Sequence, residues 1–360
     1  MVVELLTDDE YAVLQSVLVV NPESGDMVKG GGGIRKLRHA LPALAPLALA
    51  ASLLAACGGG GPVPPALLTT TAPTLVLAAS GTARLISVTN QGPNATEALQ
   101  ASATGLPTGS WMRSTCPAQL MPGASCLLLV TPGAVPTAAP GDLAPDPATV
   151  TVTGANSNAA EVRVTVLGHG SVHQGGYVFA LDDTPPLTES VGGKVLATAE
   201  SAPMHWSPTA TPVPGIYIDS TVAEGGCEGA IDGQCNTRRI LAQYPTDSRD
   251  FAAAACEDSR HGGYAGWYLP ALCELSYDNG VTRTLCGTQA APRLPDNARS
   301  RLHDTGLTSI FDFVYWSSTQ NDLNGGSVAY LAVFGRTFFT AAMGKQMAMS
   351  PSKCARAITP

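Results

Sequence analysis

Short apolar segments separated by turn residues fill the chain between residues 73 and 168. The segments read TLVLAAS, ARLISVTN, EALQASAT, ASCLLLVTP, ATVTVTG and AEVRVTVLG. Their apolar and β-branched residues show no helical spacing, and Gly, Pro or Asn stands between consecutive segments. Short strands at such regular spacing predict an all-β sandwich.

Residues 171–360 combine helix and strand patterns. GGYVFALDD and GKVLATAE predict a pair of strands, and YPTDSRDFAAAACEDSR predicts a long capped helix with Phe251, Ala255 and Cys256 on one side. In GWYLPALCEL, Pro270 suits the first position of a short helix, and Glu274 falls in its first turns. FVYWSSTQ, SVAYLAVF, RTFFTA and KCARAIT predict further strands. Two helices followed by a largely antiparallel sheet place this region in the α+β class.

An uncharged run from Ala40 to Leu53 follows the basic stretch GIRKLRHA. The run is too short to cross a bilayer comfortably, since a spanning helix needs about 20 apolar residues. It has the length of the hydrophobic part of an export signal. A buried Ala/Leu helix is the alternative, and Pro42 and Pro46 inside the run disfavour it.

Cys57 follows this run in the sequence LAAC, which resembles the lipobox of bacterial lipoproteins. In a lipobox, small residues precede a cysteine that is acylated and becomes the mature N-terminus. The resemblance implies a signal peptide over residues 33–57, a lipid on Cys57 and a membrane as partner. GGGGPVPPALLTTTA then predicts a Gly/Pro/Thr tether over residues 58–72.

The segment ahead of this signal has a different character. LTDDEYAVLQSVLVVNPESGDMVKGGGGIRKLRHA resembles the first third of RelE/HigB-type toxins, which are small ribosome-dependent ribonucleases. The basic and aromatic strands that complete such a toxin do not follow it, so no nuclease activity is inferred. We expect residues 1–32 to be a gene-fusion remnant or an over-extended start, with Met27 as an alternative initiator.

Charge and cysteine content fit an exported protein. Residues 1–56 hold 4 of the 20 basic and 6 of the 28 acidic side chains, which leaves 16 and 22 and a net charge of −6 for the rest. An acidic chain of this kind argues against nucleic acid as a partner. Of nine cysteines, eight remain once Cys57 is assigned to the lipid. An even number in an exported chain favours disulfides, although spacing alone leaves their pairing open.

CPAQLMPGASCLLLVTP, within residues 73–168, resembles a stretch found in immunoglobulin-like spacer modules of bacterial surface proteins. The resemblance implies that Cys116 and Cys126 link adjacent strands. The module has no cluster of acids, histidines or nucleophiles. We therefore interpret residues 73–168 as a spacer.

Five motifs in residues 171–360 stand in an order typical of the Lcl C-terminal domain family, found in bacterial collagen-like adhesins and many lipoproteins. They are GGYVF, HWS, GWYLPALCEL, YWSST and CARAI. The resemblance implies a compact C-type-lectin-like fold. The family closes on a more basic motif than Ala355-Arg356-Ala357, so an anion-binding role is not carried over to Arg356.

The lectin-like fold also suggests partners for the remaining cysteines. A bond between the first helix and the last strand maps to Cys256 and Cys354. The other pairs implied are Cys273 with Cys286, around the short helix, and Cys227 with Cys235. Zinc is the alternative ligand, and the absence of any CxxC motif disfavours it.

Other candidate chemistry is weaker. His169 and His173 have a metal-like spacing, but the surrounding glycines and the position between the two regions favour a linker. Ser317 and Ser318 lack the GxSxG turn of a hydrolase nucleophile, and we interpret them as partners of backbone groups beside a core Trp316. Two acidic pairs have calcium-type ligands without an EF-hand loop, namely Asp182 with Asp183 and Glu224 with Glu228.

The segment QNDLNGGS after YWSST is our candidate for a ligand-binding loop. Asn321, Asp322 and Asn324 offer hydrogen-bonding groups, and Gly325-Gly326 allows a tight turn. Amides and carboxylates suit sugar hydroxyls better than sulfated polyanions. An ordinary solvated hairpin loop is the alternative.

Taken together, these patterns predict a lipid-anchored protein of the cell envelope with a sandwich spacer and a lectin-like head. We expect the head to bind a glycan, a matrix polymer or another envelope protein, without catalytic residues, cofactor or metal. A structural envelope component is one alternative. A formylglycine-generating-type enzyme is another, because those enzymes share the broad fold but depend on a cysteine pair in a substrate groove.

Overall fold

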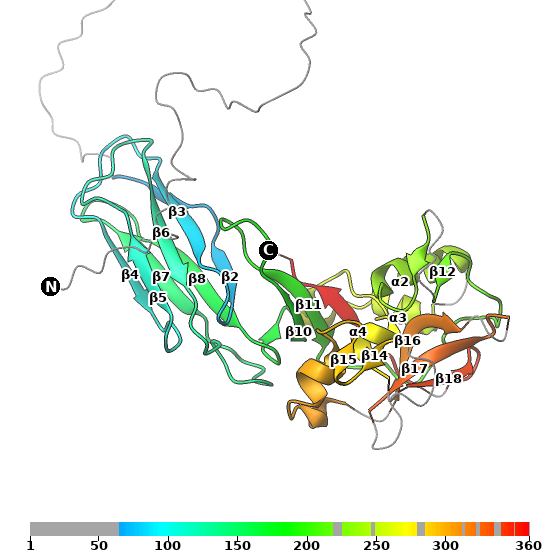
Figure 1. Ribbon diagram of the computed structural model, residues 1–360. Coiled ribbons are helices and arrows are strands. Elements are labelled where there is room, and N and C mark those ends of the chain that lie inside the picture. The colour runs from blue at the N-terminus through cyan, green and yellow to red at the C-terminus, as the bar shows by residue number, and fades with distance from the viewer. Residues whose placement is uncertain are drawn as a thin grey trace, which may run out of the picture. The chain divides into compact units, whose positions relative to one another are not determined.

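The structure, a computed structural model, describes residues 65–218, 225–245, 249–278, 285–311, 314–321, 325–334, 340–348 and 350–359. Residues 1–60 and 61–360 are two separate units, and the second contains everything described below. The toxin-like segment, the predicted signal peptide, Cys57 and most of the predicted tether lie outside the described residues. A β-sandwich is followed in the chain by an α+β head (Figure 1).

Two four-stranded sheets form an immunoglobulin-like β-sandwich, with strand orders β1-β3-β6-β5 and β2-β8-β7-β4. β2 and β8 pair in parallel, and the other pairs are antiparallel. Buried and exposed positions alternate along β7 and much of β8, so every second side chain enters the core between the sheets. The strands are β1 Leu68–Thr70, β2 Thr74–Ala78, β3 Arg84–Asn90, β4 Gln100–Thr104, β5 Trp111–Ser114, β6 Ser125–Thr131, β7 Ala148–Thr153 and β8 Ala160–Leu167.

The sandwich begins earlier than the predicted boundary at residue 73. β1 lies within the predicted tether, yet it pairs with β3 and buries Leu68. The Asn158 side chain accepts from the Leu68 N–H at 2.7 Å and donates to its carbonyl at 3.0 Å. β5 was also not predicted, because its residues are nearly all half-buried and do not alternate.

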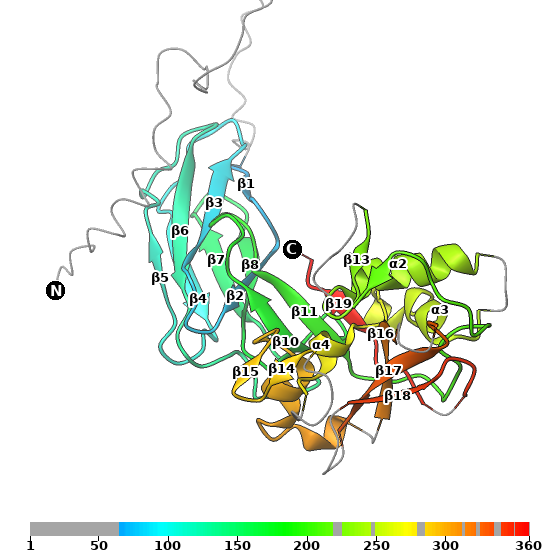
Figure 2. The same ribbon diagram turned by 45° about the vertical axis from the view of Figure 1, so that its right-hand side comes forward.

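The head contains two larger antiparallel sheets, ordered β19-β11-β10-β9 and β16-β17-β18. β19, close to residue 360, pairs with β11 of the head's first hairpin (Figure 2). Strand ranges of the first sheet are β9 Val172–His173, β10 Gly176–Asp182, β11 Gly192–Ala197 and β19 Ala355–Ala357. The second sheet holds β16 Val314–Asn321, β17 Val328–Val333 and β18 Thr340–Gly344.

Short elements complete the head. Two strand pairs are β12 Ile216–Tyr217 with β13 Cys227–Glu228, and β14 Gly287–Thr288 with β15 Ala291–Pro292. The α-helices are α2 Gly233–Gln243, α3 Ala252–Glu257 and α4 Leu272–Leu275. Single helical turns of 3-10 or π type cover His261–Gly263, Arg299–His303 and Thr308–Ile310. The α+β class is therefore as predicted.

The long helix lies in a different place from the one predicted. Among the described residues of this segment, 244–245 and 249–260, the α-helix is the six-residue α3, which begins after Phe251 in extended backbone. The eleven-residue α2 comes before it and starts at an Asp232 cap. Its buried face consists of Gly233, Asn236, Thr237 and Ile240, so it lacks the apolar periodicity by which helices are recognised.

The sandwich and the head share buried contacts. Arg84 of β3 is fully buried, and it donates to the Asp183 carboxylate at 2.5 Å and to the carbonyls of Pro185 and Pro186. The Val76 backbone of β2 bonds both the Ser190 hydroxyl and the Val191 N–H at 3.0 Å. Val76, Ala78 and Leu167 of the sandwich belong to the same apolar cluster as residues of β10 and β11. The sandwich and the head are thus packed against each other beyond the segment that connects them.

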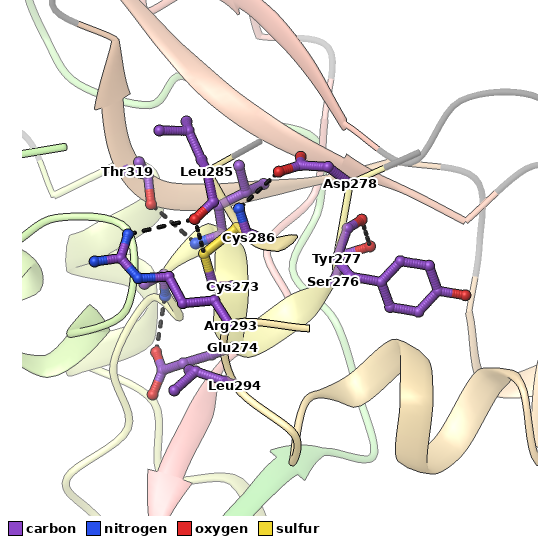
Figure 3. The surroundings of a disulfide bond; sticks show 12 residues. Cys273, Glu274, Ser276, Tyr277, Asp278, Leu285, Cys286, Arg293, Leu294 and Thr319 are labelled. Atoms are coloured by element: carbon purple, nitrogen blue, oxygen red, sulfur yellow. Dashed lines mark hydrogen bonds between the residues drawn. A yellow bond between two sulfur atoms is a disulfide. The ribbon is translucent and has the colours of Figure 1, made fainter. Parts of the chain in front are cut away.

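Four disulfides cross-link the described residues, and they join the pairs implied by the two resemblances. Cys116–Cys126 lies in the sandwich, and Cys227–Cys235 ties β13 to α2. Cys256–Cys354 joins α3 to the residue before β19 across 98 positions of sequence. Cys273–Cys286 closes the segment after α4, and Figure 3 shows its surroundings. There the Cys286 N–H donates to the Asp278 carboxylate at 2.6 Å.

The two head disulfides Cys256–Cys354 and Cys227–Cys235 should differ in their effect on stability. Chain entropy gives about 5 kcal/mol for a loop of 98 residues and about 2.5 kcal/mol for one of 8 residues. We expect the Cys256→Ala/Cys354→Ala variant to lose about 2 kcal/mol more free energy of unfolding than the Cys227→Ala/Cys235→Ala variant. Urea unfolding of the exported chain measures both. Equal losses would contradict this explanation.

Candidate functional site

The tryptophans of the head motifs belong to the scaffold. Trp206, Trp267 and Trp316 are all fully buried. Their indole N–H groups donate to backbone carbonyls of Ser317, Tyr264 and Met204 at 2.7, 2.9 and 2.8 Å respectively. The HWS, GWYLP and YWSS motifs therefore hold the core together, as the sequence predicted for Trp316.

The hydroxyls after Trp316 also bond within the core. Ser317 donates to the Tyr330 carbonyl at 2.8 Å, and Ser318 accepts from the Asn236 amide at 3.0 Å. Thr319 donates to a carbonyl at 2.7 Å and accepts a backbone N–H at 2.9 Å. All three side chains are fully buried. Ser317 thus bonds a backbone group, as predicted, whereas Ser318 bonds a side-chain amide, and a substrate in solvent does not reach either hydroxyl.

Glu274 is a buried charged residue of the head with four hydrogen-bond donors around it. Its carboxylate accepts from the Tyr268 hydroxyl at 2.8 Å, from the Lys194 ammonium at 2.5 Å, and from the Ala271 and Gly233 N–H groups at 2.8 and 3.2 Å. Lys194 comes from β11, and Gly233 begins α2. One carboxylate therefore connects a strand, the start of α2 and the start of α4. Burial, reinforced by Glu274, raises the pKa of Tyr268 well above its usual value.

Arg356 of the closing motif is likewise committed to the fold. It is 7% exposed, donates to the Ala265 carbonyl at 2.7 Å, and also bonds Gln174 and Thr359. Its guanidinium lies 4.8 Å from the centre of the Tyr264 ring. Burial lowers the pKa of this guanidinium. Arg356 thus ties the turn before β10 to the loop that carries Tyr264.

The predicted ligand loop is described only at its edges. Asn321 is not in an exposed loop, as the sequence suggested, but is the last residue of β16, pairs with Val328 and is 6% exposed. Asp322 and Asn324 lie outside the described residues. Gly325 and Gly326 have φ values of 62° and 70°, as a tight turn requires. Ligand binding by this loop stays a prediction.

The acidic pairs considered for calcium have other partners where they are described. Asp183 bonds Arg84 and the Thr82 N–H, and these groups lower its pKa against the opposing effect of burial. Asp182 accepts from Thr184, and Glu228 pairs with Arg293. Glu224 is outside the described residues. Across the described part of the chain, no group of three or more His, Cys, Asp and Glu side chains could hold a metal ion.

A cleft of about 610 Å³ lies between the outer face of β2 and β8 and the first turn of the head. The sandwich contributes Thr74, Arg163 and Thr165 to its lining, and the head contributes His173 and Tyr264. Sequence reasoning missed this site because its residues come from both regions. The only local signal was the unusual His/Gly stretch HGSVHQGG at the joint.

The turn between β9 and β10 forms the head side of this cleft. Gln174 and Gly175 both have positive φ, 47° and 84°. A Cβ atom on Gly262 would lie 2.6 Å from the Cα atom of Gly175, so the two turns pack backbone to backbone. Burial, with a smaller effect of Arg356, lowers the pKa of His173 to about 4, so its ring is neutral at pH 7.

No protein-family model matches the chain. Among solved structures, it is similar to the E. coli chaperone DraB, at 14% identity over 29% of this chain and 57% of that one, with a TM-score of 0.21. The periplasmic chaperone SfaE matches at 13% identity over 39% and 77% of the two chains, with a TM-score of 0.22. The chain thus spans a little over half of DraB.

A third similar structure is SSP-19, an MSP-domain protein like family member from Caenorhabditis elegans. It matches at 11% identity over 28% of this chain and 99% of that one, with a TM-score of 0.22. Similarities at these identities and TM-scores carry no conclusion about function.

Two further observations bear on location. The four disulfides indicate an oxidising compartment outside the cytoplasm. Within the described residues, no helix combines the length and apolar character needed to span a membrane.

Removing the Glu274 carboxylate should destabilise the head strongly. Glu274→Ala leaves the Lys194 ammonium, the Tyr268 hydroxyl and two N–H groups without their acceptor, and we expect a loss of about 3–5 kcal/mol. Tyr268→Phe removes only one of the donors and should cost about 1 kcal/mol. Urea unfolding of the two variants gives both values, and a similar loss in both would show that Glu274 does not have this central role.

Proposed function

We propose that this chain is a lipoprotein of a bacterial cell envelope whose lectin-like head binds a glycan, a matrix polymer or another envelope protein without catalysis. The resemblance of five motifs to the Lcl C-terminal domain supports this proposal. In the structure, the tryptophans, hydroxyls and Glu274 of these motifs are buried and bonded within the scaffold, which leaves the exposed residues for binding. The observation that carries it is a head cross-linked by three disulfides and packed onto a sandwich. A cross-linked head of this kind is suited to bind a ligand on its exposed surface outside the cell.

The packed joint between sandwich and head supports the role of the sandwich as a spacer. Arg84 and Val76 bond the head's 183–191 segment directly. The sandwich therefore contacts the head directly, in addition to the chain segment that connects them. A spacer of this kind would hold the head in a defined position relative to the sandwich.

Enzymatic activity of the formylglycine-generating type is less well supported. That chemistry depends on a cysteine pair in a substrate groove. All eight cysteines of the described residues are joined in disulfides. Three of these four disulfides lie in the head. In this oxidised form none of these thiols is available as a nucleophile.

Lipidation of Cys57 can be tested through processing. We expect the mature protein to begin at an acylated Cys57, and Cys57→Ser to accumulate as an unacylated precursor. Intact mass and labelling with a radioactive fatty acid measure both in membrane fractions. Cys116→Ser, which removes a sandwich cysteine outside the signal, serves as control and should still be acylated. Recovery of Met1 or Met27 at the N-terminus of the membrane-bound form would contradict the assignment.

Binding can be tested with a glycan array and a pull-down from envelope extracts, using the mature full chain. If the loop after β16 is the recognition site, Asp322→Ala/Asn324→Ala should abolish binding to the ligand found while leaving the melting temperature nearly unchanged. Asn321 is kept in this variant, because its buried side chain belongs to the strand. Glu97→Ala, an exposed acidic change on the sandwich, is the control. Unaltered affinity in the double variant would place the site elsewhere.

A further inference from the structure

The sandwich wall of the cleft presents polar side chains from two paired strands. Thr74 of β2 is opposite Arg163 of β8, and Val76 is opposite Thr165. Because side chains alternate along strands, Arg163 and Thr165 point to the same outer face of the sheet. Arg163 is exposed, and its side chain has no hydrogen-bond or ion-pair partner among the described residues. An unpaired guanidinium thus faces the cleft.

The head wall presents an aromatic ring and a buried nitrogen. Tyr264 is 38% exposed, and the Arg356 guanidinium packs against its ring. That contact fixes the ring and leaves part of it open to the cleft. Nε2 of His173 is buried and has no hydrogen-bond partner in the described part of the chain. The Tyr264 ring is therefore the part of this wall that a ligand can reach, since Nε2 of His173 is covered.

The charge of the lining differs from that of the whole protein. The chain carries a net charge of −8, yet the lining contains one arginine, two histidines and no carboxylate. Glu161 is two residues before Arg163 on β8 and is not part of the lining. The local charge therefore favours an anionic group over a neutral or cationic one. A volume of about 610 Å³ falls in the roughly 300–1,000 Å³ range of small-ligand sites.

We propose that this cleft binds a short glycan that carries a carboxylate, such as a uronic acid oligomer. Arg163 pairs with the carboxylate, as guanidinium groups do in bidentate fashion. Tyr264 packs against the face of a sugar ring, and the side chains of Thr74 and Thr165 bond its hydroxyls. The inference rests on the proposed binding function but assigns it to a place separate from the loop after β16.

The test uses the mature full chain with two matched probes, trigalacturonate and a neutral galactose trimer, in isothermal titration calorimetry. We expect the wild type to prefer trigalacturonate, with an affinity that falls as salt is raised. Arg163→Gln should lower the affinity for trigalacturonate about tenfold or more and remove the preference for it over the neutral trimer. Tyr264→Ala should lower the affinity for both probes about three- to tenfold.

Arg238→Gln is the matched control, because it removes one exposed charge from α2, outside the cleft lining. It should bind like the wild type, and melting temperatures should show that Arg163→Gln is folded. The proposal is overturned if the wild type binds neither probe, if it prefers the neutral trimer, or if Arg163→Gln binds as the wild type does.

The loop variant Asp322→Ala/Asn324→Ala separates this proposal from the wider one. It should keep trigalacturonate binding if the cleft is the site. If the cleft variants have no effect while the chain still binds ligands on the array, the cleft assignment fails and the binding function stands.

Discussion

The head depends on the return of the chain to its first hairpin. β19 pairs with β11, and Ala355 exchanges two backbone hydrogen bonds with Tyr268 of the GWYLP motif at 2.8 and 2.9 Å. Cys354 beside it is bonded to Cys256 of α3. The segment from Cys354 to the end of β19 thus brings together the hairpin, the loop with the GWYLP motif and helix α3. Removing this strand would open the first sheet and leave the Tyr268 backbone groups unpaired.

The same return shapes the cleft. Arg356 of β19 bonds Gln174 in the turn before β10 and packs against Tyr264. Its interior position explains why an arginine in the closing motif need not contact an external anion. In the site that we propose, the exposed Arg163 of the sandwich contacts the anion instead. One arginine therefore supports the wall of the cleft while another supplies its charge.

Much of the fold could be predicted from the sequence, and the exceptions have physical reasons. Alternation was enough to locate most strands of the sandwich, because one side of each strand packs in the core. Helix α2 was missed because Asn236 and Thr237 face inward, where they bond Ser318 and Leu269 rather than apolar neighbours. Asn321 resembled a loop residue by composition, yet strand pairing buries it. The cleft could not be predicted, since no local pattern reports which side chains of two separate regions face each other.

Pairing between the two ends of the head also affects when it can fold. Gln174 bonds Thr359, 185 positions later, and the Cys256–Cys354 bond needs a residue almost as late. Contacts this distant in sequence form slowly, because the loop between them must close first. The first hairpin gains its last neighbour strand only when β19, Ala355–Ala357, is available to pair with β11. The first sheet therefore stays incomplete until this late strand arrives, and the same strand brings Cys354 to Cys256.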